Sequence, residues 1–173
     1  MTDVPHEVVR EFIDAVVKDP ARADAMLTEH PALLNARWTH NETVLHYLAI
    51  EGFSDGVRFL ASRGGDVNSV NEFGDTALVE IAVLGLTEIA DILLNHGADP
   101  NALSSINDNP LHTAVRKGYA HLVRRLLKAG ADAGYRTELG ETVFDAVNES
   151  PVRKRQELLA ALSEFGIRDP AAE

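Results

Sequence analysis

The stretch Asn109-Pro110-Leu111-His112-Thr113-Ala114 decides the fold, because close copies of its beginning recur along the chain. The copies are Thr43-Val44-Leu45-His46, Thr76-Ala77-Leu78-Val79 and Thr142-Val143-Phe144-Asp145. Successive starts always lie 33 residues apart. A second signature, rich in glycine and aspartate, keeps the same register at 64–68, 97–101 and 130–134. A constant interval of this kind indicates an array of structural repeats.

The central copy shows what each repeat contains. Thr76 can satisfy the free N–H groups at the start of a helix, and Gly85 suits the end of that helix. A second helix is predicted over 87–95, where Ile89, Ile92 and Leu93 are spaced to form one apolar stripe. The residues that follow are rich in Gly, Asn and Asp, which is typical of an extended turn. Each repeat is therefore predicted to be helix, turn, helix and hairpin.

Two short helices cannot bury their apolar faces alone, so such units must stack on one another. The pattern resembles the ankyrin repeat, whose Thr-Pro-Leu-His-x-Ala motif is matched best at 109–114 and well at 43–46. The resemblance implies an all-α fold, a solenoid of stacked helix-turn-helix units joined by β-hairpin-like loops. It also implies the family's general role, which is a non-catalytic scaffold for protein–protein interaction.

The register predicts a single ankyrin-repeat domain over residues 1–173. Its parts are an N-terminal cap over 1–37, full repeats over 38–70, 71–103 and 104–136, a C-terminal cap over 137–166 and a frayed tail over 167–173. Caps are expected because an end unit exposes one side to water. Helical patterns over 5–18 and 22–29 precede the first motif, and Ser150-Pro151 replaces the usual glycine near the other end.

The charge and cysteine content narrow the range of partners and compartments. The chain has 27 Asp and Glu against 16 Lys and Arg, which gives a net charge of -11. The electrostatic field of this negative charge repels phosphate backbones and anionic lipids. Neither nucleic acid nor a membrane is expected as a partner. The absence of cysteine and of a signal-peptide pattern in residues 1–10 predicts a cytoplasmic protein. A stack of this size is expected to be a monomer.

The sequence offers little chemistry for catalysis. His46 and His112 occupy the same place in two repeats and are interpreted as structural residues that order the start of a helix. His30, His40 and His96 have no second metal ligand at useful spacing. Phosphate-cradling, dinucleotide and nucleophile-elbow motifs are absent. No metal, no cofactor and no enzymatic activity are predicted.

Apolar residues at unusual positions are the candidates for binding a partner protein. In a stack of this kind the hairpin tips and first helices line a concave face, where side chains are not needed for packing. His40, Phe73, Ile106 and Leu139 lie three residues before each repeat start, and three of these four are apolar. The other candidates on this face are Trp38, Ile50, Val83 and Leu84. Packing of the tips on one another is the alternative explanation.

The third repeat opposes the overall charge. Residues 109–131 contain Arg116, Lys117, Arg124, Arg125 and Lys128 and no acidic residue. Arg116 and Lys117 are predicted at the end of the first helix, where an acidic peptide segment of a partner could dock. Binding of an anion or nucleic acid through this repeat is the alternative function, and a solvated face balanced by neighbouring acidic residues is the simpler explanation.

Overall fold

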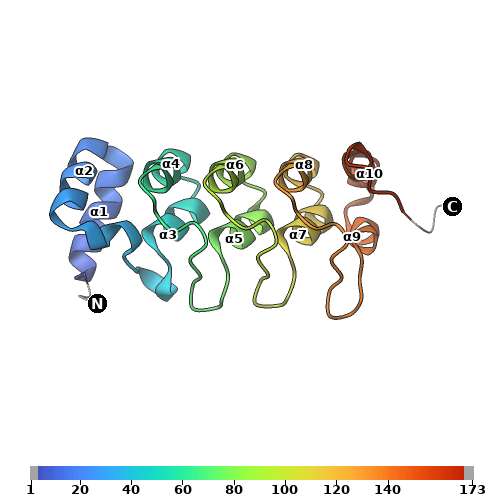
Figure 1. Ribbon diagram of the computed structural model, residues 1–173, viewed down its shortest axis with the longest axis horizontal. Helices are drawn as coiled ribbons and strands as arrows, with labels where there is room; N and C mark the ends of the chain where they lie inside the picture. Colours follow the sequence, from blue (N-terminus) through green and yellow to red (C-terminus); the bar gives the residue numbers. More distant parts are fainter. Residues whose placement is uncertain (1–3, 170–173) are drawn as a thin grey trace.

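The computed structural model describes residues 4–169, in which the helices lie in antiparallel pairs along a single row (Figure 1). The α-helices of this part are α1 (His6–Lys18), α2 (Pro20–Glu29), α3 (Val44–Ile50), α4 (Ser54–Ser62), α5 (Ala77–Leu84), α6 (Thr87–Asn95), α7 (Pro110–Lys117), α8 (Ala120–Lys128), α9 (Val143–Glu149) and α10 (Arg155–Glu164). Short 3-10 turns are η1 (Pro31–Asn35), η2 (Thr39–Asn41) and η3 (Val152–Lys154).

Side-chain caps fix where the first helix of each repeat begins. The residue that opens the motif is the N-cap, and its side-chain oxygen accepts a hydrogen bond from the backbone N–H three residues later. These capping residues are Thr43, Thr76, Asn109 and Thr142. Gly85 and Gly118 end α5 and α7 with φ of 74° and 84°, a left-handed conformation that favours glycine. The predicted helix starts are therefore confirmed.

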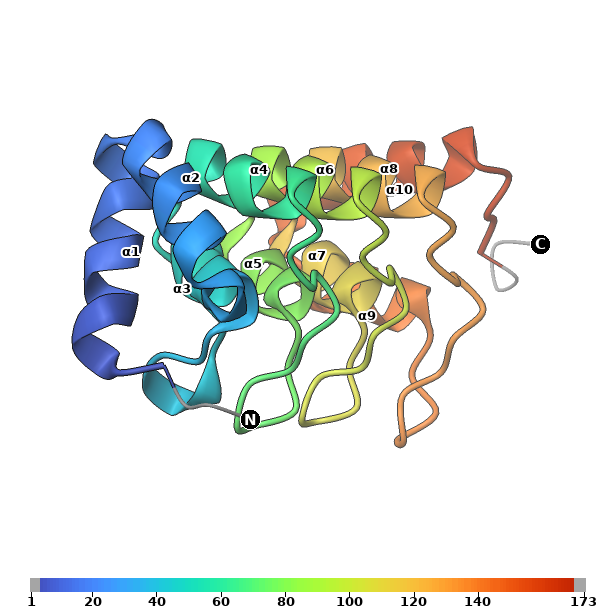
Figure 2. The same ribbon diagram turned by 60° about the vertical axis from the view of Figure 1, so that its left-hand side comes forward.

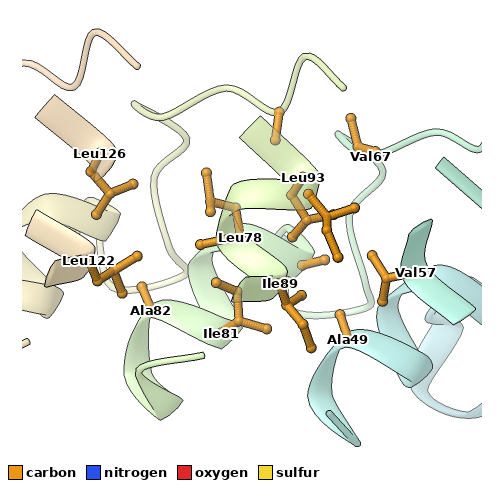
Figure 3. Packing of buried hydrophobic residues seen from close by; sticks show 14 of the residues in the cluster. Ala49, Val57, Val67, Leu78, Ile81, Ala82, Ile89, Leu93, Leu122 and Leu126 are labelled. Carbon is orange, nitrogen blue, oxygen red and sulfur yellow. The ribbon is translucent and has the colours of Figure 1, made fainter. Parts of the chain in front are cut away.

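The helix pairs stack in two layers, with hairpin loops extending from one side (Figure 2). The first helices α3, α5, α7 and α9 form one layer, and the second helices α4, α6, α8 and α10 form the other. The core runs along the row: Leu78 and Ile81 of α5 lie between Ala49 of the preceding repeat and Leu122 of the following one (Figure 3). The all-α ankyrin-type solenoid predicted from the sequence is confirmed.

An asparagine ladder explains the second sequence signature. Oδ1 of Asn68 accepts a hydrogen bond from the backbone N–H of Asp99 at 2.8 Å, and its Nδ2 donates to the carbonyl of Gly97 at 2.9 Å. Asn35 and Asn101 accept equivalent bonds from the next repeat at 2.8 Å each. Each rung satisfies exposed backbone groups of a neighbouring turn. The corresponding residue in the last repeat is Gly134, which has no side chain to continue the ladder.

The two ends of the stack differ from the repeats between them. In the N-terminal unit α2 begins at Pro20, two residues earlier than the predicted pattern, because Asp19 accepts a hydrogen bond from the backbone N–H of Arg22. At the other end η3 joins α9 to α10. Ile167, placed by the sequence in a frayed tail, is half-buried against the core. The rest of that predicted tail reaches into residues 170–173, which lie outside the described residues.

Candidate protein-binding face

The tips of the three hairpins carry large apolar side chains into solvent. Phe73, Ile106 and Leu139 are 59%, 79% and 86% exposed, and one period separates each from the next. At such exposures Ile106 and Leu139 are not packed on neighbouring tips. We call the surface formed by the tips and by the C-terminal ends of α3, α5 and α7 the hairpin face. Exposed apolar groups in a regular row are uncommon on a monomer that binds nothing.

Hydrogen bonds hold the hairpin that carries Phe73 in one conformation. Oδ1 of Asn71 accepts from the backbone N–H of Phe73 at 2.9 Å and of Asp75 at 3.0 Å. The carboxylate of Asp75 in turn accepts from the backbone N–H of Ser105 in the next hairpin at 2.6 Å. Gly74, with φ of 88°, allows the tight turn between them. The tip therefore presents Phe73 from a well-ordered loop.

The two aromatic candidates of the first repeat lie in different surroundings. The His40 ring is exposed, and its centroid lies 6.4 Å from that of Phe73, so the two tips are neighbours. Trp38 instead is half-buried against the core, with its ring centroid 5.2 Å from that of His6. Trp38 thus belongs to the junction with the N-terminal cap and is not part of the row of tips.

The ends of the first helices add apolar surface to the hairpin face. Val83 and Leu84 at the end of α5 are 46% and 48% exposed. Ile50, one period before Val83, is half-buried. The second repeat therefore exposes Val83 and Leu84 in addition to Phe73.

Arg116 differs from its predicted role as a free contact for an acidic partner. Its guanidinium pairs with Asp108, with Glu141 at 3.6 Å and with Glu149 at 2.6 Å. Asp108 precedes the same helix, whereas Glu141 and Glu149 belong to the C-terminal cap. Three carboxylates already surround this guanidinium, so Arg116 acts within the chain. Lys117 beside it is exposed and forms no ion pair among residues 4–169.

The other two arginines of 109–131 are also paired. Arg124 lies 2.9 Å from Glu164 of α10, and Arg125 forms an ion pair with Asp91 of α6. With Arg116, three of the five basic side chains of 109–131 meet carboxylates within the chain. The structure therefore gives no support to an anion or nucleic-acid site on this repeat, because its charge is balanced locally.

Carboxylates lie around the first and second repeats without such a balance. Glu42, Glu51, Glu72, Asp75 and Glu80 form no ion pair with Lys or Arg in the described part of the chain. Burial, together with the charges of Glu42 and Asp75, raises the pKa of Glu80 to about 7. Burial also raises the pKa of Glu42, which is 8% exposed.

The histidines of the motif have structural partners. His46 is fully buried, with Nδ1 3.0 Å from Thr43 Oγ1 and Nε2 3.3 Å from the carbonyl of Asp75 in the next hairpin. His112 makes the same contact with Asn109 at 3.0 Å and meets the edge of the Tyr135 ring. Burial lowers the pKa of both imidazoles, so both are neutral near pH 7.

Residues 4–169 contain neither a cluster of metal-binding side chains nor a membrane-spanning helix. No group of His, Cys, Asp and Glu side chains within this range is arranged to hold a metal ion. Nor does any helix there combine the length and the apolar character that crossing a bilayer requires.

Comparison with known families agrees with this architecture. The family model described as Ankyrin repeats (3 copies) matches residues 6–104 and 45–138. Because these matches cover more than half of the chain, the protein belongs to the ankyrin-repeat family. None of the curated proteins compared with it gives a significant match. Proteins of this family are generally non-catalytic modules for protein–protein interaction.

Sequence reasoning missed three residues, which are Glu42, Glu80 and His6. It gave no role to Glu42 and Glu80, although both lie one or two periods from polar residues of other repeats. It also missed His6, whose ring covers Trp38, because the cap lies outside the 33-residue register. For Glu42 a signal was available, because acidic residues occupy 42, 75, 108 and 141, one period apart.

Proposed function

We propose that this chain binds a partner protein on its hairpin face, with Phe73, Ile106 and Leu139 as the principal contacts. The observation that carries the proposal is the regular row of apolar side chains that remain in solvent on ordered hairpins. Aromatic and large aliphatic anchors dominate the energetics of protein interfaces. Val83 and Leu84 would extend the contact along α5, with His40, Ile50 and Lys117 at its borders.

The proposal describes a scaffold without chemistry of its own. In it the chain acts as a monomer, needs no cofactor and works in the cytoplasm. A cysteine-free composition and a net charge of -11 support a protein suited to a reducing compartment and kept apart from nucleic acids. Trp38 and Arg116 contact the N-terminal and C-terminal caps, respectively, and are left out of the contact set.

Affinity capture from a native lysate tests the proposal. The bait is the full chain, compared with a Phe73→Ala/Ile106→Ala/Leu139→Ala variant. The matched control is Val152→Ala/Leu159→Ala/Phe165→Ala, which removes three other apolar side chains that are 75%, 43% and 42% exposed on the C-terminal cap. We expect a prey that the wild-type chain and the control recover and the tip variant loses. Equal recovery of every prey by all three baits would refute the proposal.

A further inference from the structure

The third repeat contains its own example of how a cation is held on the hairpin face. The Arg116 guanidinium reaches Asp108 before its helix, and Glu141 and Glu149 of the following unit. A planar cation with several N–H donors suits carboxylates that approach it from different directions.

The same carboxylate position recurs in earlier repeats without the cation. Glu42 and Asp75 lie two periods and one period before Asp108, so each occupies the same place, directly before the N-cap of a first helix. The positions that correspond to Arg116 hold Ile50 and Val83, which carry no charge. The first and second repeats therefore keep the acidic half of this arrangement and lack the basic half.

The two acidic side chains at this position differ, because the Asp75 carboxylate accepts hydrogen bonds from the N–H and Oγ of Ser105, at 2.6 and 3.4 Å, whereas Glu42 has no such partner in the described part of the chain. Glu42 as a whole is nine-tenths buried, but its carboxylate oxygens still reach solvent, and they accept no hydrogen bond and form no ion pair among residues 4–169. A carboxylate that is partly shielded from water and still open to the surface is a favourable contact for a cation from outside the chain. Burial and the nearby carboxylates of Glu72 and Glu51 raise the pKa of Glu42, and the nearby His40 opposes them.

Glu80 on α5 adds a third carboxylate to the same place. Its Oε1 accepts a hydrogen bond from Asn71 Nδ2 at 2.9 Å, whereas its Oε2 is buried without a partner. The same Asn71 side chain accepts a hydrogen bond from the backbone N–H of Asp75 at 3.0 Å, so Glu80 and Asp75 lie beside one residue, and the charges of Glu42 and Asp75 raise the pKa of Glu80. Arg37 forms no ion pair with them in the described part of the chain, and its guanidinium donates to the carbonyls of Asn41 and Val70 at 2.8 Å.

We propose that the partner inserts an arginine or lysine side chain among Glu42, Asp75 and Glu80, in the place that corresponds to the Arg116 guanidinium in the third repeat. The inference rests on the proposed function, because Phe73 on the same hairpin as Asp75 would contact apolar residues that flank the cation. The partner segment is then basic and apolar in composition, and complementary to the acidic surface around the first two hairpins.

Selection from a library of random phage-displayed dodecapeptides on the immobilised full chain tests this inference. Peptides with Arg or Lys next to aliphatic or aromatic residues are expected to be enriched. The best enriched peptide is then titrated calorimetrically against the wild-type chain and a Glu42→Gln/Glu80→Gln variant. Loss of the charged contact is expected to weaken binding about tenfold. The control Asp55→Asn/Glu88→Gln removes equal charge from α4 and α6 and should change the affinity less than about twofold.

Two further arms separate a local contact from a general charge effect. Replacing the peptide's arginine by citrulline should weaken binding to the wild-type chain and have little effect on the Gln variant, as in a double-mutant cycle. Ile50→Arg places a guanidinium in the register of Arg116 and should weaken the arginine peptide by competing for the same carboxylates. Thermal melting of both variants checks that they remain folded.

The outcomes distinguish this inference from the proposed function. Peptides without basic residues, no enrichment at all, or equal affinity for the wild-type chain and the Gln variant would overturn the inference. If peptides are enriched and bind the Phe73→Ala/Ile106→Ala/Leu139→Ala variant more weakly than the wild-type chain, the proposed function stands without the cation site. Binding that is unchanged by the tip variant as well would overturn both.

Discussion

The guanidinium of Arg116 donates from Nε to the Glu149 carboxylate at 2.6 Å, across one 33-residue period. Because Arg116 also contacts Asp108 and Glu141, one side chain links the third repeat to the hairpin and the first helix of the C-terminal cap. This link stands where the asparagine ladder has ended, since Gly134 cannot continue it. The last unit is thus attached by charge in addition to apolar packing.

Arg116→Met should therefore destabilise the protein by about 2 kcal/mol, mainly at the C-terminal cap. The substitution leaves the Asp108 carboxylate, 7% exposed, without its cation. Urea unfolding measures the change in free energy, and hydrogen exchange should show faster opening of α9 and α10. The control is Lys117→Met, which removes a neighbouring exposed charge. Equal effects of the two substitutions would show that the Arg116 network does not stabilise the cap.

Leucines that begin the buried stripe should respond very differently from the tips. Leu78→Ala and Leu111→Ala remove fully buried side chains and should each cost about 2 to 5 kcal/mol of folding free energy. Phe73→Ala, at a position 59% exposed, should change it by no more than about 0.5 kcal/mol. Chemical denaturation of the three variants tests the contrast. A large loss with Phe73→Ala would mean that the tip is needed for folding.

The asparagine ladder should contribute measurably to coupling between repeats. Asn68→Ala removes the bonds to Asp99 N–H and the Gly97 carbonyl, and because Asn68 is exposed we expect a cost of about 1 kcal/mol. Asn95→Ala, at an exposed position of α6, is the matched control. Amide exchange at Asp99 should accelerate in the first variant and stay unchanged in the second. Unchanged exchange in both variants would show that the ladder does not couple neighbouring repeats.

Glu80 should make stability depend on pH in a defined direction. Its pKa rises from the ordinary value of 4.5 to about 7 on folding, so the folded state holds the proton more tightly than the unfolded state. Stability from this group is full below pH 4.5, falls as pH rises to about 7 and is constant above it. Glu80→Gln keeps an acceptor for Asn71 and should raise the free energy of unfolding at pH 8 by about 1 to 2 kcal/mol.

The comparison of Glu80→Gln with the wild-type chain isolates this group. Burial lowers the pKa of His46 and His112, so those residues lower stability as pH falls, and their effect is common to both proteins. Denaturation at pH 4 and pH 8 should give a difference that nearly vanishes at the lower pH. A difference of the same size at both values would show that Glu80 does not titrate as described.

The sequence predicted the repeat architecture well because its signals are local. Thr76 and Gly85 cap the two ends of the same helix, and each acts on the backbone next to it. Register also brought Phe73, Ile106 and Leu139 into one row. Such features depend on spacing along the chain, which a constant period makes visible.

Features that depend on contacts between units could not be predicted in this way. The charge of Arg116 was evident, yet its partners Glu141 and Glu149 lie 25 and 33 residues away and are reached only after stacking. Trp38 was expected on the binding surface, but His6 and the core cover part of it. Side-chain direction and the docking of a cap are set by tertiary packing, and the 33-residue spacing gives no information about them.

The dissociation constant of a captured partner tests the central proposal most directly. It is measured for the wild-type chain, for Phe73→Ala/Ile106→Ala/Leu139→Ala, and for Val152→Ala/Leu159→Ala/Phe165→Ala as control. If the tips are anchors, Phe73→Ala alone should cost about 2 kcal/mol of binding free energy, and the tip variant should bind at least about 30-fold more weakly. The control should bind like the wild-type chain. A tip variant with wild-type affinity would contradict the proposal.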